Sequence, residues 1–179
     1  MLTCEDAVLI VIDAQGKLAR VVADSERSIG QIRKLVQGAC LLNVPVLLTA
    51  QVPEKLGHTV PEIATLLPEQ DDIPRVSFSV LAESQVADRL ADLGRRQVIL
   101  SGFETHICLY QSALDLLGAS YQVYLATDAV SSRSLSDKTT ALTELAGQGV
   151  HLVTVEMVLF SLLRDANHPA FKAVSALIK

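Results

Sequence analysis

The stretch Ala7-Val8-Leu9-Ile10-Val11-Ile12-Asp13 decides the fold class of this chain. Its apolar residues follow one another without the polar alternation of a half-exposed strand, and they stop abruptly at an aspartate. A continuous, largely β-branched run of this length is typical of a strand buried on both faces, as in a parallel sheet covered by helices on both sides. The stretch therefore predicts a central strand of an α/β protein.

Segments of the same kind recur along the chain and alternate with helical patterns. Further short strands are predicted at residues 44–50, 73–74, 97–101, 121–126 and 150–155. Helices are predicted at 28–42, around Val86 and Leu90, and at 107–117, 136–146, 156–164 and 169–178. Strand–helix alternation implies βαβ units. We therefore expect a three-layer α/β/α, Rossmann-like fold with a doubly wound, mostly parallel sheet of six strands.

The composition narrows the class of protein. The 179 residues are 50% hydrophobic and 4% aromatic, and 15 basic side chains face 20 acidic ones, for a formal net charge of −5. That length suits one domain, which we expect to span residues 1–179. The acidic balance and the scarcity of aromatic side chains argue against nucleic acid as a partner, because phosphate backbones need a basic face.

The cysteines and the first residues predict a compartment. Cys4, Cys40 and Cys108 are an odd number at wide spacing, which fits free thiols in a reducing environment. The first residues lack the basic segment of a signal peptide, and the apolar run at 7–12 is too short to cross a bilayer. We therefore expect a soluble, cytoplasmic protein with no membrane partner.

Three chemically useful side chains follow predicted strands. Asp13 ends the first strand, Arg75 follows the short strand at 73–74, and Cys108 follows the strand at 97–101 by one tight turn. Taken singly, a cysteine on an apolar helix is more often a small buried hydrophobe, and a strand-end aspartate is often a helix cap. Ligands of open α/β sheets gather at the carboxyl ends of strands, so the convergence of all three there favours a catalytic site.

The predicted place of Cys108, in the first turn of a helix, indicates nucleophilic chemistry. Free N–H groups and the positive end of the helix dipole favour a thiolate there. The same N–H groups can stabilise an oxyanion during acyl transfer. Burial would raise the pKa of Asp13 and suit it to accept the thiol proton.

The motif Ser101-Gly102-Phe103-Glu104-Thr105-His106-Ile107-Cys108 resembles that of the isochorismatase-like cysteine hydrolases. The stretches 11–15, 75–79, 126–134 and 168–172 extend the resemblance over nearly the whole chain. The last two are most similar to the subgroup called isochorismatase domain-containing protein 2. The family's doubly wound α/β fold agrees with the fold expected from the strand pattern.

The resemblance implies roles for individual residues. Cys108 would be the nucleophile that forms a thioester, and Asp13 the general base that takes the thiol proton and later activates water. Arg75 stands where family members usually carry a lysine. The resemblance also implies a cis peptide between Phe103 and Glu104, so that the N–H groups of Glu104 and Cys108 would form an oxyanion hole.

Departures from the family pattern narrow the expected chemistry. A guanidinium stays charged and cannot transfer a proton. Arg75 would therefore act only electrostatically, and by lowering the pKa of Asp13 it would make that base weaker. The metal-binding histidines of nicotinamidases have no counterpart around His58, so we expect no metal and no cofactor. Since true isochorismatases need no cysteine, Cys108 favours hydrolysis of an amide, carbamoyl or related C–N bond.

Two alternatives stand beside a metal-free cysteine hydrolase of small C–N substrates. A non-catalytic member of the fold would bind a small molecule or a protein. An isochorismatase-type ether hydrolase would work at Asp13 and would not need Cys108. The family's members usually assemble, so we also expect a homo-oligomer, a dimer or a tetramer.

Some further residues receive predicted roles. Gln15 and Gln51 would line the substrate pocket, because each follows a strand at the same edge as Asp13. His106 is assigned a surface or capping role, since side chains two residues apart diverge on a helical turn. The segment 131–134 is interpreted as a turn before the next helix, with contact to a substrate or a neighbouring subunit as the alternative.

Overall fold

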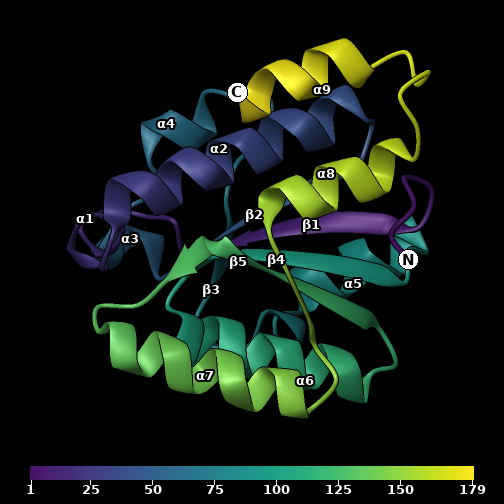
Figure 1. Cartoon of the computed structure of the whole chain (residues 1–179). Coiled ribbons are helices and arrows are strands. Elements are labelled where there is room, and N and C mark those ends of the chain that lie inside the picture. Colours follow the sequence, from purple (N-terminus) through teal and green to yellow (C-terminus); the bar gives the residue numbers. More distant parts are fainter.

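The computed structural model describes residues 1–179 and has the predicted three-layer architecture (Figure 1). All its strands are parallel and form one sheet in the order β3-β2-β1-β4-β5-β6. The strands are β1 (Ala7–Ile12), β2 (Val46–Gln51), β3 (Ile73–Arg75), β4 (Gln97–Phe103), β5 (Gln122–Ser131) and β6 (His151–Val153). The strand order reverses between β1 and β4, which makes that junction the switch point of a doubly wound sheet.

Helices cover both faces of the sheet. One face packs against α2 (Ser25–Leu41), α8 (Val155–Leu163) and α9 (Phe171–Ile178), and the other against α5 (Ser84–Leu93), α6 (Tyr110–Gly118) and α7 (Leu135–Gly147) (Figure 1). Shorter elements lie in the connections: α1 (Leu18–Val21), α3 (Pro53–Leu56), α4 (Pro61–Ala64), the 3-10 turn Val80–Ala82 and the π-helical turn Thr105–Leu109. None of the helices has the length and hydropathy that a membrane span requires.

Strand β1 shows why a continuous apolar run marks the centre of this sheet. Its odd-numbered residues enter the hydrophobic core beneath α2, and its even-numbered residues enter the core beneath α5 and α6. All of them are at most 1% exposed. A strand shared by two cores has no polar face, because successive side chains point to opposite sides.

The predicted elements are present with shifted ends, and one of them differs in kind. The helix expected at 107–117 begins as the π-helical turn Thr105–Leu109 and becomes α-helical only at Tyr110. The Leu109 N–H donates to the Glu104 carbonyl at 3.3 Å, which closes the wider turn. Cys108 therefore lies in a π turn, and its predicted place in an ordinary first helical turn is corrected.

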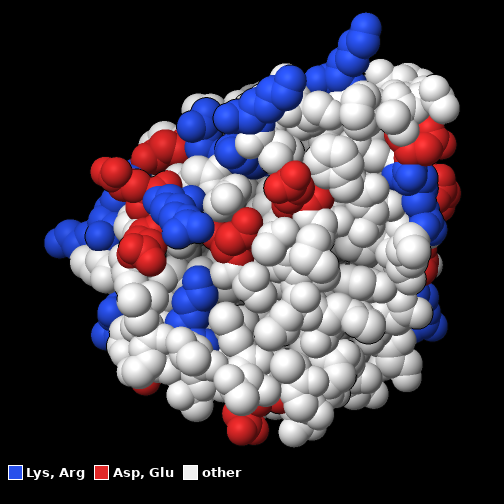
Figure 2. All heavy atoms as spheres, viewed as in Figure 1, with Lys and Arg blue, Asp and Glu red and all other residues white.

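Charged side chains are unevenly spread over the face seen in Figure 2. Lys and Arg gather over α2 and α9, whereas the area below α8, in front of α6 and α7, is mostly uncharged. Helix α8 adds the exposed apolar side chains of Met157 and Phe160. These two side chains are apolar surface that a homo-oligomer would bury, and such an assembly stays a prediction.

Candidate active site

The three predicted side chains meet at the carboxyl edge of the sheet. Asp13 directly follows β1, Arg75 ends β3, and Cys108 lies in the π turn after β4. They are 1%, 2% and 4% exposed, respectively. Since β1 pairs with both β2 and β4, residues far apart in the chain become neighbours at this switch point.

Asp13 and Arg75 form a buried ion pair, in which Nη2 of Arg75 donates to Oδ2 of Asp13. The second carboxylate oxygen, Oδ1, accepts from the Gln51 N–H at 3.0 Å. On the other side of the guanidinium, Nη1 donates to the carbonyls of Ser77 at 2.5 Å and Phe78 at 2.8 Å. The two buried charges, which have lost their contact with water, are thus paired with each other and hydrogen-bonded, as a buried ion pair requires.

The shape of Arg75 explains what it does in place of a lysine. Its planar fork presents donors in two directions, toward Asp13 and toward the turn that follows β3. An ammonium is a compact charge on one nitrogen and would not reach both sets of acceptors in the same way. Arg75 therefore connects the carboxylate to the backbone of its own loop as well as neutralising it.

The Cys108 thiol is held protonated at neutral pH. Burial raises its pKa most, and the charge and hydrogen bonding of Asp13 raise it further. The charge of Arg75 lowers the pKa of the thiol, but by less than burial and Asp13 raise it, so the pKa of Cys108 reaches about 12. The expectation of a thiolate favoured by the helix N-terminus is therefore wrong for the resting site, because desolvation and a neighbouring carboxylate outweigh the dipole.

Burial also raises the pKa of the Asp13 carboxyl group. The charge of Arg75 and the hydrogen bonds from Cys108, Arg75 and Gln51 oppose this rise but do not overcome it. The rise predicted from burial is thus confirmed, and the arginine acts in the predicted opposite direction without overcoming it. A raised pKa makes the carboxylate a stronger proton acceptor beside the thiol.

The two glutamines predicted to line the pocket lie in different surroundings. Gln15 is fully buried, its Oε1 accepts from the Gln51 N–H at 2.7 Å, and its Nε2 donates to the carbonyls of Gln51 and Gly57 at 3.0 and 2.6 Å. Its amide is therefore used to hold loops together. Gln51 is partly exposed, and its Oε1 lies 4.0 Å from the Sγ of Cys108. Gln51 is thus the glutamine whose side chain approaches the thiol.

The residues between β4 and Cys108 are tied to the segment that follows β5. The Phe103–Glu104 peptide is cis, in agreement with the resemblance. The Oε1 of Glu104 accepts from the N–H of Arg133 at 3.1 Å and from its Nε at 2.9 Å. Sequence reasoning used only the N–H of Glu104 and missed this pairing, for which the only signal was the motif at 126–134.

His106 also faces the segment after β5. Its Nδ1 lies 3.0 Å from the Oγ of Ser132, and its Nε2 lies 3.8 Å from the carboxylate of Asp137. Both ring nitrogens therefore have partners in the connection to α7 and in its first turn. Both partners are side chains, so these contacts fix the ring, and the surface or capping role of His106 stays a prediction.

A large cavity lies away from this site. It measures about 720 Å³ and is lined by the start of the chain and the ends of α2 and α8, at the opposite edge of the sheet. It includes none of Asp13, Arg75 and Cys108. No group of three or more His, Cys, Asp or Glu side chains is arranged to hold a metal ion. The candidate chemistry is therefore that of the buried side chains at the switch point.

The fold and the site together define a doubly wound α/β protein with buried ionisable groups at its switch point. The isochorismatase domain matches residues 7–157, and the chain belongs to the isochorismatase family of hydrolases. The predicted family and fold are thereby confirmed.

Known relatives agree with this assignment. Isochorismatase domain-containing protein 2 of Danio rerio is 38% identical over 180 residues, which cover 99% of this chain and 89% of that protein. Isochorismatase domain-containing protein 1 of Danio rerio is 43% identical over 154 residues, which cover 85% of this chain but only 53% of that protein. The chain thus spans about half the length of the latter relative.

A solved structure shares the whole fold. The MAR1 ribonuclease from Caenorhabditis elegans superposes with a TM-score of 0.93 at 34% identity, over 99% of this chain and 91% of that chain. The similarity therefore includes the edge of the sheet at which the site lies.

We expect Asp13→Asn to make the Cys108 thiol more acidic. The carboxylate raises the pKa of the thiol and Arg75 lowers it, so removal of the carboxylate charge leaves the arginine unopposed. Each unit by which the pKa falls multiplies the thiolate fraction at pH 8 by about ten. Alkylation of Cys108 by iodoacetamide at pH 8 should therefore accelerate about tenfold or more, as measured by site-resolved mass spectrometry.

Two references make that measurement specific. The exposed Cys40 is an internal standard for reagent and pH. Asp72→Asn removes another buried carboxylate, one that accepts from the Thr59 N–H at 3.0 Å, and should leave Cys108 unchanged. Two results would contradict a thiol pKa that Asp13 raises. One is a wild-type alkylation rate of Cys108 that stops rising below pH 8, and the other is slower alkylation in Asp13→Asn.

Proposed function

We propose that this protein is a metal-free cysteine hydrolase that cleaves an amide or carbamoyl C–N bond of a small molecule through a thioester at Cys108. The observation that supports this most is the burial of a thiol beside a carboxylate whose pKa is raised. A protonated nucleophile beside a strengthened base is suited to proton transfer during attack. Arg75 keeps the carboxylate in place without taking part in the transfer.

The reaction has two halves. As the Sγ of Cys108 attacks the carbonyl carbon, its proton passes to Asp13. The C–N bond then breaks, and Asp13 returns that proton to the leaving amine, so a thioester remains. In the second half Asp13 takes a proton from water, the resulting hydroxide adds to the thioester carbon, and the C–S bond breaks. The sulfur recovers its proton from Asp13, and the acid product leaves.

Negative charge develops on the carbonyl oxygen in both halves. We assign its stabilisation to the N–H groups of Glu104 and Cys108, which flank the turn between β4 and the nucleophile. The Glu104 N–H donates to no backbone carbonyl of the chain, so it is free to bind a substrate oxygen. Donors that are aimed in advance at such an oxyanion are each worth about 10²–10³ in rate.

Acetylation by p-nitrophenyl acetate tests the nucleophile before the natural substrate is known. We expect the wild type to gain one acetyl group on Cys108 and to release p-nitrophenolate. Cys108→Ala should release p-nitrophenolate at least about 10³-fold more slowly, because the nucleophile is lost. Cys40→Ala removes a thiol outside the site and should match the wild type. The measurements are absorbance and peptide mass spectrometry.

Screening of small amides and carbamoyl compounds then separates the alternatives. Hydrolysis that survives Cys108→Ala but is lost in Asp13→Asn would overturn the thioester and would leave Asp13 as the group that acts without the cysteine, as the ether-hydrolase alternative requires. Tight binding without turnover in the wild type would favour a non-catalytic member of the fold. Cytoplasmic location, one domain over residues 1–179 and the absence of a metal stay predictions.

RNA is the competing substrate class, because the Caenorhabditis elegans relative is described as a ribonuclease. The net charge of −5 weighs against a polyanion, and Arg75 is already paired with Asp13. Incubation with single-stranded RNA at low salt decides the matter. RNA cleavage that disappears in Asp13→Asn would show that RNA, and not a small C–N compound, is the substrate.

A further inference from the structure

We propose that the Glu104–Arg133 pair positions the oxyanion hole, so that Arg133, from a different loop, acts on acyl transfer through Glu104. The inference rests on the proposed function, because it assigns a purpose to one of the two N–H donors. Arg133 is a positioning residue in this account, since its contact is with Glu104 and not with the reacting atoms.

The sheet brings the two residues together. Strands β4 and β5 are neighbours, and their pairing continues to Phe103 opposite Ser131. Glu104 is the first residue after β4, and Arg133 is the second residue after β5. One carboxylate oxygen of Glu104 receives both the N–H and the Nε of Arg133, at 3.1 and 2.9 Å. Two donors from a single residue constrain the position of the Glu104 side chain more than one flexible contact would.

Burial gives this contact its importance. The side chain of Glu104 is 8% exposed and that of Arg133 is 63% exposed. An exposed ion pair contributes little by itself, but a buried carboxylate requires a partner. The side chain and the N–H of Glu104 extend from the same Cα, so a buried carboxylate that is held by Arg133 limits how far this Cα and its N–H can move. A misplacement of about 1 Å at a reacting centre costs about 10²-fold in rate.

A second contact supports the same segment. The Nδ1 of His106 lies 3.0 Å from the Oγ of the buried Ser132. Glu104 is therefore tied to Arg133 and His106 to Ser132, so the loop after β5 holds the start of the π turn.

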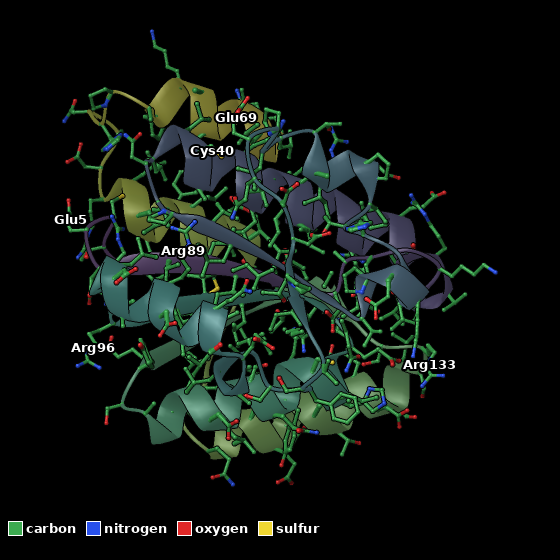
Figure 3. The ribbon with its side chains drawn as sticks, turned by 180° about the vertical axis from the view of Figure 1, so that it is seen from behind. Glu5, Cys40, Glu69, Arg89, Arg96 and Arg133 are labelled. Carbon is green, nitrogen blue, oxygen red and sulfur yellow. The ribbon has the colours of Figure 1, made fainter.

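In Figure 3 the labelled Arg133 lies at the opposite end of the molecule from Arg96.

Two reactions at the same sulfur separate positioning from general damage. In alkylation by iodoacetamide, the sulfur displaces iodide at a saturated carbon, and no oxyanion forms. In acetylation by p-nitrophenyl acetate, the sulfur adds to a carbonyl, its proton passes to Asp13, and p-nitrophenolate leaves when the ester C–O bond breaks. Only the second reaction needs the Glu104 N–H. A positioning role therefore affects acetylation and leaves alkylation unchanged.

We expect Arg133→Ala to acetylate Cys108 about tenfold more slowly than the wild type, and Glu104→Ala about 100-fold more slowly. Both variants should alkylate Cys108 at the wild-type rate. Glu104→Gln keeps a carbonyl oxygen for the two donors of Arg133 and should recover most of the acetylation. Arg96→Ala removes an exposed arginine at the opposite end of the molecule and should match the wild type in both reactions.

Each remaining outcome has one meaning. Equal losses of acetylation and alkylation in Arg133→Ala would show general loosening and would overturn the inference. Wild-type acetylation in both alanine variants would overturn it as well, while the thioester mechanism would stand. A wild type that is alkylated at Cys108 but never acetylated there would overturn the proposed function, and the positioning role with it.

Discussion

Gly102→Ala should destabilise the folded protein by more than about 4 kcal/mol, enough to prevent recovery of folded protein. Gly102 has a φ of 117°, which side chains rarely tolerate. A Cβ at this position would lie 1.9 Å from the carbonyl oxygen of Ile12 and 2.7 Å from its carbonyl carbon. Both are backbone atoms of the central strand β1, which is buried on both faces, so neither can move without breaking the β1–β4 pairing.

Two other glycines provide matched controls for urea unfolding. Gly30 in α2 has no atom within 4 Å of a built Cβ, so Gly30→Ala should leave stability unchanged or raise it by up to about 1 kcal/mol. At Gly38 a Cβ would lie 2.3 Å from the Cδ2 of Leu159, a side-chain atom that can move. Gly38→Ala should therefore cost an intermediate amount, about 1–3 kcal/mol. A urea midpoint of Gly102→Ala near that of Gly30→Ala would contradict the close approach of residue 102 to the carbonyl of Ile12.

Arg75→Met should cost about 3–5 kcal/mol at neutral pH, because it leaves a buried carboxylate without a counter-charge. The methionine fills a similar volume, so most of the loss is electrostatic. The effect should depend on pH. Without the arginine, nothing of comparable charge opposes the rise in the pKa of Asp13 that burial causes.

The direction of the pH dependence follows from proton binding. The folded form of Arg75→Met keeps a proton on Asp13 at a pH where the unfolded chain has released it. Its free energy of unfolding should therefore be highest below the ordinary carboxyl pKa of about 4 and fall as the pH rises toward the folded value. Urea unfolding of the variant and the wild type across this range measures the difference.

Arg75→Lys tests whether charge or hydrogen bonding matters more at this position. An ammonium restores the counter-charge but not the two-sided contact, so the variant should lie between the wild type and Arg75→Met in stability. A loss equal to that of Arg75→Met would show that the charge is not what stabilises the site. An unchanged acetylation rate in Arg75→Lys would also count against the expectation that the arginine makes Asp13 a weaker base.

The sequence by itself determined the layers of this protein and the edge at which its site lies. The apolar run of β1 could be read because strand periodicity is local, and a run without polar positions has two buried faces. Asp13, Arg75 and Cys108 could be placed together because parallel strands share one carboxyl edge, whichever order they take. The family motif then predicted roles for single residues, and it predicted the cis peptide between Phe103 and Glu104 that the structure contains.

Only the tertiary structure decided the state of these groups. The protonation of Cys108 depends on burial and on charges brought in from other strands, and Asp13 and Arg75 pair across 62 positions of the chain. A helix-dipole argument considers one element alone, so it predicted the opposite direction. The Glu104–Arg133 pair likewise joins two loops whose separation is set by the pairing of β4 with β5. Electrostatic energies depend on distances through space, and those distances exist only once the chain is folded.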